Sequence, residues 1–247
     1  MKKFFTLAIL ALLFTSCKNE LTFKEERFEK KSTLPCKENC PEVTVTVPVA
    51  ENVPIVADSI NKKVFAVVKE IIYFGEKPYT SKDYQGLLDS FIGSYDEMKT
   101  KNPKEIFGWE AKIDAKVTYH TDSILNIRME NYMFTGGAHG YSGIRSLIFD
   151  PKTGKNIPNE YLFRDLNKFK AFAETKFRAK YKIPTEQNIN ATGLMFESDR
   201  FELPMSYFFQ ENGLLLYYNT YEVASYVDGP KELLLSYEEL KPYLLLK

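Results

Sequence analysis

The chain contains 247 residues, with 33 basic and 33 acidic side chains and 44% hydrophobic residues. This length is enough to bury a sizeable hydrophobic core. The balanced charge argues against the basic surface that a nucleic-acid-binding protein needs, so we expect no nucleic-acid partner. No run of residues approaches the roughly twenty consecutive apolar residues that cross a bilayer as a helix.

The N-terminal residues have the pattern of a lipoprotein signal peptide. Two lysines precede an uncharged run over residues 4–14, and a small residue, Ser16, precedes Cys17. Eleven residues rise only about 16 Å as a helix, roughly half of a bilayer core, so this run does not span as a permanent anchor. We therefore predict a signal peptide over residues 1–16 and lipidation of Cys17. An ordinary secretory signal followed by a chance cysteine is the alternative, because Phe14 stands where leucine is usual.

Lipidation would determine where the protein is located. Acyl chains on Cys17 contribute about 0.8 kcal/mol per buried methylene, so several chains hold a protein firmly to a membrane. Lys18, rather than aspartate, follows the cysteine and favours the outer membrane of a Gram-negative bacterium. Cleavage removes two of the 33 basic residues, which leaves 31 against 33 acidic residues and a formal charge of −2. Such a charge offers no strong field to steer a ligand.

Residues 17–40 are rich in charge and poor in apolar side chains, which predicts a tether between the lipid and the folded region. Cys36 and Cys40 form an even pair in a compartment that permits oxidation. A short disulfide loop and two free thiols are both compatible with this spacing. We expect no metal site here, because no further cysteine is available once Cys17 is lipidated.

The folded region is predicted to begin with a strand and two helices. Valines alternate with threonines over residues 42–49, which is typical of a strand with one buried face, and Pro48 suggests an edge position. Apolar residues then recur at three- and four-residue spacing over residues 56–74 and again over residues 81–99. Both stripes predict helices that face a core.

The middle of the chain is predicted to form three strands and a helix. Two long strands occupy residues 106–134 around a turn at 121–123, and a further strand covers 141–149. Proline and glycine within residues 150–154 predict a tight turn. A helical stripe follows over residues 162–181.

The last part of the chain is less regular. Residues 182–203 show no period, and an Asn-Gly pair at 212–213 between two apolar runs predicts a hairpin over 207–218. A last strand is expected over 231–237 and a short helix over 238–245. Strands and helices alternate without a βαβ rhythm, so we predict an α+β fold with a mixed, mostly antiparallel sheet packed with three main helices.

The loop over residues 135–140 is the segment with the most unusual composition. Gly136, Gly137 and Gly140 allow backbone angles that other residues avoid. The loop could cradle an anion or a sugar, with His139 exchanging a proton. The other interpretation, which spacing alone favours, is a bend between strands with a structural histidine.

Catalysis would require partners for His139 that the sequence does not identify. Ser142 and Ser146 are near but lie in no nucleophile-elbow pattern. His120 is the other histidine of the chain, and no zinc-binding spacing joins the two. The two carboxylates of a glycosidase cannot be located among 33 acidic residues. We therefore assign no catalytic residue, no metal and no cofactor, and keep an envelope hydrolase centred on His139 as the alternative function.

Tyrosines are numerous, at 16, and several gather late in the chain. They could stack on sugars or anchor an interface, although half-buried strand residues are the more common case. The candidate ligand-binding residues are Gly136, Gly137, His139, Gly140, Tyr141, Tyr221 and Tyr226.

Three stretches resemble known families. The sequence TGGAHG at 135–140, with the following Phe-Asp and Thr-Gly-Lys, resembles the opening of the RsiV-type C-terminal domain. The sequence YEVASY at 221–226 with Gly-Pro, and then LSYEEL at 235–240, resembles its close, although Val223 stands where isoleucine is usual. The region from about 40 to 116 is similar to the PdaC-type N-terminal domain. We accordingly expect an N-terminal region over 41–120 and a C-terminal domain over 121–247, together forming one compact unit.

This resemblance implies recognition at the cell envelope. Most of the family has no known function. One relative is an anti-sigma factor whose extracellular part binds lysozyme, and another carries a peptidoglycan deacetylase domain. The chain shows neither a sigma-binding segment nor the aspartate and histidine motifs of that deacetylase domain. We therefore expect a non-enzymatic binding or sensing module, with lysozyme or peptidoglycan fragments as partners and the membrane contacted through the lipid.

Overall fold

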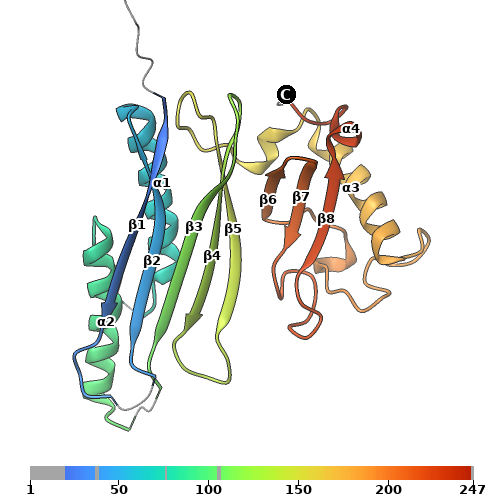
Figure 1. The fold of residues 1–247 in the computed structure, drawn as a ribbon. Helices are drawn as coiled ribbons and strands as arrows, with labels where there is room; N and C mark the ends of the chain where they lie inside the picture. Colours follow the sequence, from blue (N-terminus) through green and yellow to red (C-terminus); the bar gives the residue numbers. More distant parts are fainter. Residues whose placement is uncertain (1–19, 37–38, 76, 105–106, 246–247) are drawn as a thin grey trace, which may run out of the picture.

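The computed structural model describes residues 20–36, 39–75, 77–104 and 107–245, which fold into two lobes side by side (Figure 1). The predicted signal peptide and the lipidation site Cys17 lie outside these residues. Within the described ranges, no helix is long and apolar enough to cross a membrane.

The first lobe is a five-stranded sheet covered on one face by two helices (Figure 1). Its strands follow the chain order, as β1 (Thr22–Lys31), β2 (Glu42–Glu51), β3 (Glu110–His120), β4 (Leu125–Phe134) and β5 (Tyr141–Phe149). All neighbours are antiparallel except β2 and β3. A parallel pair needs a long crossover, and helices α1 (Pro54–Ile72) and α2 (Tyr84–Lys101) supply it.

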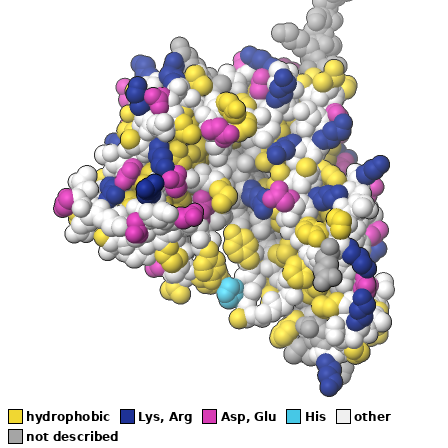
Figure 2. All heavy atoms as spheres, turned by 180° about the vertical axis from the view of Figure 1, so that it is seen from behind, with side chains coloured by type: hydrophobic (Ala, Val, Ile, Leu, Met, Phe, Trp, Pro, Cys, Tyr) yellow, Lys and Arg dark blue, Asp and Glu magenta, His cyan; other side chains and the backbone are white. Residues whose placement is uncertain are grey.

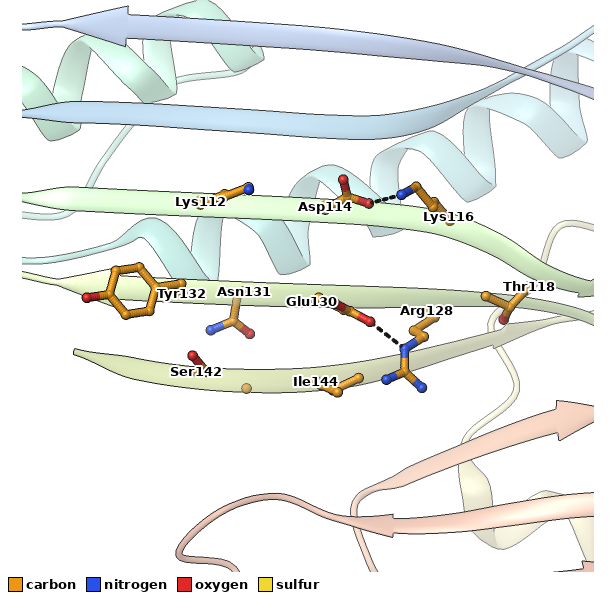
Figure 3. Close-up of a pocket in the computed structure, with 11 residues that line it drawn as sticks. Lys112, Asp114, Lys116, Thr118, Arg128, Glu130, Asn131, Tyr132, Ser142 and Ile144 are labelled. Atoms are coloured by element: carbon orange, nitrogen blue, oxygen red, sulfur yellow. Dashed lines mark hydrogen bonds and ion pairs between the residues drawn. The ribbon is translucent and has the colours of Figure 1, made fainter. Parts of the chain in front are cut away.

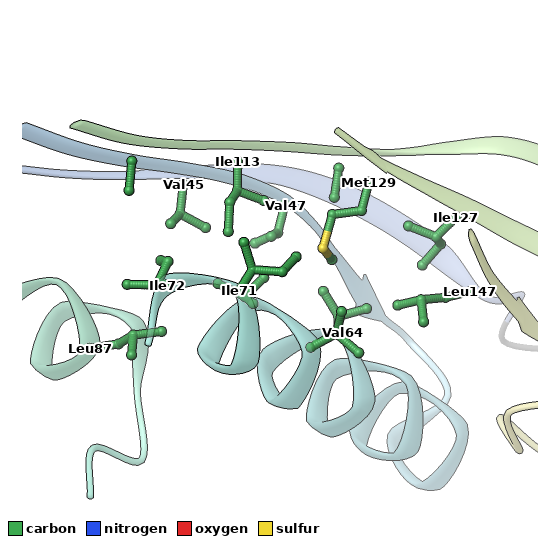
Figure 4. Close-up of a cluster of buried hydrophobic side chains, with 14 of the residues drawn as sticks. Val45, Val47, Val64, Ile71, Ile72, Leu87, Ile113, Ile127, Met129 and Leu147 are labelled. Atoms are coloured by element: carbon green, nitrogen blue, oxygen red, sulfur yellow. The ribbon is translucent and has the colours of Figure 1, made fainter. Parts of the chain in front are cut away.

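The core of the first lobe follows directly from the alternation of apolar residues in the strands and from their three- and four-residue spacing in the helices. Alternate residues of the strands, such as Val45, Ile113 and Ile127, point to the helices and are at most 1% exposed. Val64 and Ile71 on the stripe of α1 face them (Figure 4). Both predicted helices are present, with α1 beginning two residues earlier than predicted and α2 three residues later. Pro54 stands in the first turn of α1, where its missing N–H costs nothing, and the Asp83 carboxylate caps α2 by accepting from the Gly86 N–H at 2.8 Å.

The prediction of a tether over residues 17–40 is wrong, because β1 lies within this segment and pairs with β2 along ten residues. The many charged side chains of β1 obscured the alternation of apolar and polar residues that would have predicted a strand. Phe28 packs toward the core and stacks on Tyr84 with ring centroids 4.7 Å apart. The many exposed charges protect the open edge of β1 from pairing with another chain. Between β1 and β2, Cys36 and Cys40 are joined by a disulfide bond.

The edge position inferred from Pro48 is also wrong, because β2 has neighbours on both sides. Its parallel ladder with β3 covers only Glu42 to Thr46, however. Pro48 lies beyond the end of this ladder, where a missing N–H donor removes no bond to β3.

The second lobe has its own three-stranded antiparallel sheet, formed by β6 (Ser206–Gln210), β7 (Gly213–Tyr218) and β8 (Lys231–Ser236). The predicted hairpin is confirmed, with Gln210 paired to Gly213. A side chain at Gly213 would overlap the Leu235 carbonyl, so the tight approach of β8 requires glycine there.

Helix α3 (Leu166–Tyr181) packs on this second sheet (Figure 1). It begins four residues later than predicted, because Asp165 caps it by accepting from the Lys168 N–H at 3.1 Å. The residues before it form the short 3-10 helix η1 (Asn159–Leu162), and a second one, η2 (Glu197–Asp199), interrupts the irregular segment. The chain closes with α4 (Tyr237–Leu240).

The α+β class is confirmed, but its strands are divided between two sheets. The expected domain boundary at residue 120 is misplaced. It falls between β3 and β4, which are neighbouring strands of one sheet. The change of lobe comes after β5 instead, at the turn that follows Phe149.

Polar side chains join the lobes along a seam between β5 and the second lobe. The side-chain amide of Asn219 pairs with the backbone of Ile144 as a neighbouring strand would. It accepts from the Ile144 N–H at 2.7 Å and donates to the Ile144 carbonyl at 3.0 Å. Fully buried Asn126 donates to Ser146 Oγ at 2.8 Å and accepts from the Phe209 N–H at 2.9 Å. Side-chain amides satisfied in this way, one buried and one half-buried, hold one relative position of the lobes.

Candidate functional site: an aromatic rim at the seam

The loop between β4 and β5 owes its shape to glycine. Gly136 and Gly137 have φ values of +112° and +97°, which side chains with a Cβ rarely adopt. A Cβ at either position would meet no atom within 4 Å, so backbone angle rather than lack of space requires glycine. Gly140 serves packing, because a Cβ there would overlap the Tyr132 ring. The loop thereby carries His139 to the end of the seam.

His139 meets two of the late tyrosines. Its ring stacks on that of Tyr226, with centroids 4.8 Å apart and planes inclined by 24°. The Tyr226 ring in turn lies 5.7 Å from that of Tyr221. Both tyrosines are about half exposed, at 50% and 52%. We call His139, Tyr141, Tyr221 and Tyr226 the aromatic rim.

The motif at 221–226 places anchored residues between two exposed tyrosine rings. Glu222 fastens it, because its carboxylate accepts from the Met205 N–H at 2.9 Å and from the Asn219 N–H at 2.8 Å. Val223 and Ala224 are buried in the second core. Tyr221 has a left-handed φ of +69°. A constrained backbone therefore presents the two tyrosine rings to solvent.

A groove of about 580 Å³ runs along the seam beside the rim. Tyr141, Tyr221 and exposed Met205 line it. Figure 2 shows the molecule hollowed between the two lobes, with hydrophobic side chains in the lower part of the hollow. Charged residues from α1 and β5 add polarity, including the ion pair of Arg145 and Glu70 at 2.8 Å. We call this hollow the seam groove.

A second hollow of about 580 Å³ lies on the helix-free face of the first sheet (Figure 3). Asp114 on β3 and Glu130 on β4 are directly opposite each other. Lys116 pairs with Asp114 at 3.0 Å, which raises the pKa of Lys116, and Arg128 pairs with Glu130 at 2.8 Å. Sequence reasoning missed this carboxylate pair, although charged residues at every second position of two adjacent strands could have indicated it.

This carboxylate pair is poorly suited to acid–base catalysis. A glycosidase acid must keep its proton near neutral pH, which burial in apolar surroundings achieves. The Asp114 and Glu130 side chains are instead 36% and 58% exposed and each faces its own cation. The face offers hydrogen-bonding groups and charge rather than a general acid.

The surroundings of His139 do not assemble a catalytic dyad either. In the described part of the chain, its Nδ1 lies 3.0 Å from the Gly140 carbonyl and its ring contacts Tyr226, with no serine or carboxylate bonded to it. Ser146 donates its hydroxyl to the Tyr207 carbonyl. The described residues also hold no cluster of three or more groups suited to a metal ion. The arrangement can hold a ligand by stacking and hydrogen bonding.

The late tyrosines divide into two sets. Tyr207, Tyr217 and Tyr218 are at most 8% exposed, and burial raises the pKa of each hydroxyl. They belong to the packing of the second lobe. Tyr221 and Tyr226 remain at the surface, so the structure brings together the candidate residues from two loops that lie far apart in sequence.

Comparisons with known proteins agree with the two-lobe division. Residues 35–142 match the family described as Deacetylase PdaC, and residues 157–238 match the family described as Protein of unknown function (DUF3298). The TGGAHG loop at 135–140 therefore falls within the first match, and its assignment to the opening of the C-terminal domain was wrong. No curated protein matches the chain.

Two crystal structures of DUF3298 family proteins share the fold. The protein from Pseudomonas aeruginosa PAO1 is 19% identical, with a TM-score of 0.64 over 92% of this chain and 94% of that one. The protein from Bacteroides fragilis NCTC 9343 is also 19% identical, with a TM-score of 0.65 over 92% of this chain and 95% of that one. The chain thus combines a PdaC N-terminal domain with a DUF3298 C-terminal domain.

Proposed function

We propose that this protein is a lipid-anchored envelope protein that binds a cell-wall glycan at the aromatic rim without altering it. The observation that carries the proposal is the stack of His139, Tyr226 and Tyr221, held half exposed beside the seam groove. Exposed rings fixed by a constrained backbone lose little entropy when a ligand covers them.

The seam groove supports the same function. Its volume of about 580 Å³ lies within the range of roughly 300–1,000 Å³ typical of small-ligand sites. Apolar rings at the rim and the amide of Asn131 inside it offer both a stacking surface and hydrogen bonds. Sugar rings, which have an apolar face and a polar edge, match this combination.

The anchoring part of the proposal rests on the N-terminal sequence. Cys17 follows a signal-peptide pattern, and acyl chains on it would hold the domain at an envelope membrane, in our proposal the outer membrane of a Gram-negative bacterium. Mass spectrometry of the protein purified from membranes tests this step. A mature N-terminus at an unmodified residue would contradict it.

Calorimetric titration of the protein with a soluble disaccharide–peptide fragment of peptidoglycan tests binding. Replacing Tyr226 by alanine should weaken binding about tenfold, or roughly 1.4 kcal/mol, and His139→Ala and Tyr141→Ala should also weaken it. Tyr161→Ala is the matched control, because Tyr161 is 67% exposed but lies on η1, outside the groove. Unchanged affinity in the rim variants would contradict the proposal.

A protein ligand such as lysozyme is the second candidate, because apolar side chains extend the rim. Val227, which follows Tyr226 in the chain, and Met205, which lines the seam groove, are 94% and 78% exposed, and exposed apolar side chains often mark protein interfaces. Titration with lysozyme at physiological salt, beside another basic protein of similar size, distinguishes the two candidates. Saturable binding of lysozyme alone, lost in Val227→Ser, would favour the protein ligand over the glycan.

A further inference from the structure

Another hollow, separate from the seam groove, lies at the other end of the seam. It lies between the β3–β4 turn of the first lobe and the corner where β8 meets α4 in the second, and its volume is about 690 Å³. Residues of the β3–β4 turn and of the β4–β5 loop are separated by the length of β4, ten residues or about 34 Å of strand. This hollow, which we call the upper pocket, is therefore separate from the aromatic rim.

Aromatic and aliphatic side chains form the walls of the upper pocket. The rings of Tyr119 and Phe209 stack across the seam with centroids 5.8 Å apart and planes inclined by 29°. Ile124 and Leu244, each at most 7% exposed, and the ring of Tyr237 complete the apolar lining. A planar or acyl group would bury its surface there.

The walls are fixed before any ligand arrives. The Tyr237 hydroxyl donates to the Gln210 carbonyl at 2.7 Å, and burial raises the pKa of this hydroxyl. The turn on the other side is closed by Thr121, whose Oγ1 accepts from the Ile124 N–H at 3.1 Å. Arg164 is oriented by donating from Nε to the Leu244 carbonyl at 3.1 Å. Preformed walls reduce the entropic cost of binding.

Two cations, Arg164 and Lys241, line the upper pocket. Among the residues that the structure describes, neither Arg164 nor Lys241 forms an ion pair. The Arg164 guanidinium retains N–H donors beyond the one that Leu244 uses, and these match a carboxylate or sulfonate. Apolar walls and free cations together favour an amphiphilic anion.

We propose that the upper pocket binds a small amphiphilic anion, with its ring or acyl body against Tyr119 and Phe209 and its acid group paired with Arg164 and Lys241. Asp122 and Glu238 also line the pocket. Their carboxylates disfavour a ligand with several negative charges and favour one that carries an N–H or O–H donor beside its single acid group.

The probe for this site is 8-anilinonaphthalene-1-sulfonate, which has an aromatic body, one sulfonate and an N–H group. Its fluorescence should rise saturably with one site per chain. Arg164→Gln should weaken binding five- to tenfold and Lys241→Gln about threefold. Arg200→Gln, at an exposed arginine outside the pocket, and Tyr226→Ala, at the rim, should leave the affinity unchanged.

The uncharged analogue N-phenyl-1-naphthylamine tests the role of the acid group. It should bind more weakly than the sulfonate and should respond to neither Arg164→Gln nor Lys241→Gln. Because Arg164 also supports the C-terminal turn, Lys241→Gln carries the decision if Arg164→Gln lowers the Tm. Wild-type affinity for the sulfonate in Lys241→Gln, or its loss in Tyr226→Ala, would overturn the proposal.

Discussion

The hydrophobic cores of the two lobes differ in the side chains that form them. The first core lies between one layer of strands and two long helices, and valine, isoleucine and leucine dominate it. The second core lies among α3, the second sheet and an irregular segment, and aromatic rings make up a larger share of it than of the first core. Phe177 alone lies within 4.5–5.5 Å, between ring centroids, of four other rings. Large rings can fill the uneven spaces that irregular backbone leaves, whereas regular layers accept aliphatic side chains in ordered rows.

This difference changes how the aromatic content of the chain is interpreted. In the second lobe most phenylalanines and tyrosines are structural, so their number by itself does not indicate a ligand. The informative rings are the few that this lobe leaves exposed, Tyr221 and Tyr226. Their exposure follows from the anchored motif around Glu222 rather than from any lack of room in the core.

The largest expected effect comes from removing the central ring of the second core. Phe177→Ala should lower the free energy of unfolding by about 3–5 kcal/mol, because the cavity cannot be filled by the surrounding rigid rings. Urea unfolding followed by far-UV circular dichroism measures the loss. Trp109, the one tryptophan, is buried in the first core and reports that lobe by fluorescence. A cost below about 1 kcal/mol would show that the second core is loosely packed.

The next effect concerns the link between the two cores. Asn126→Ala should cost about 1–3 kcal/mol, because it leaves the buried Phe209 N–H without an acceptor. It should also separate the Trp109 fluorescence transition from the circular dichroism transition, since the lobes would no longer unfold together. Asn167→Ala, at an exposed position of α3, is the control. Coincident transitions in Asn126→Ala would mean that other contacts couple the lobes.

A smaller effect depends on pH at the end of the second lobe. Hydrogen bonds from Lys176 and Ser236 lower the pKa of Glu239 from 4.5 to about 2. A carboxyl whose pKa is lower in the folded state contributes stability above pH 4.5, and this contribution is lost as the pH falls toward 2.

Glu239→Gln should therefore be less stable than the wild type at pH 6, by about 0.5–1 kcal/mol given the partial exposure of the pair. The difference should vanish near pH 2, while the capping geometry is retained because glutamine also fits the capping box. Urea unfolding across pH 2–7 measures it, with Glu238→Gln as the neighbouring control. A difference that persists at pH 2 would assign the effect to geometry rather than charge.

The smallest expected effect on stability is at the rim. Tyr226→Ala should change the free energy of unfolding by less than about 0.5 kcal/mol, because the ring is half exposed and packs mainly on His139. Thermal unfolding of this variant beside Phe177→Ala contrasts an exposed ring with a buried one. A drop in Tm comparable with that of Phe177→Ala would make the rim a structural element and remove it as a binding surface.

Much of the secondary structure was predictable because its signals are local. Valine–threonine alternation at β2, the helical stripes of α1 and α2, and the Asn-Gly hairpin each depend on residues close in the chain. The failures also have local causes. Charges on both sides of Phe28 concealed β1, and the cap at Asp165 delayed the start of α3.

The candidate site was only partly predictable. The sequence alone identified unusual residues at Gly136, His139, Tyr221 and Tyr226, because glycine-rich turns and clustered tyrosines are visible in one dimension. It gave no reason to place His139 against Tyr226, and it could not single out Asp114 and Glu130 as neighbours. Strand register determined the second pair, and the packing of two loops determined the first.

The sequence by itself determined the class of fold, the elements with a clear period and the need for glycine at Gly136 and Gly137. Each of these depends on the preferences of short segments. Tertiary structure alone decided that the sheet is divided, that β1 joins it, and that a rim and two hollows lie along the seam. These features arise where residues distant in the chain meet, and the side-chain amides of Asn126 and Asn219 hold the lobes in the one arrangement that creates them.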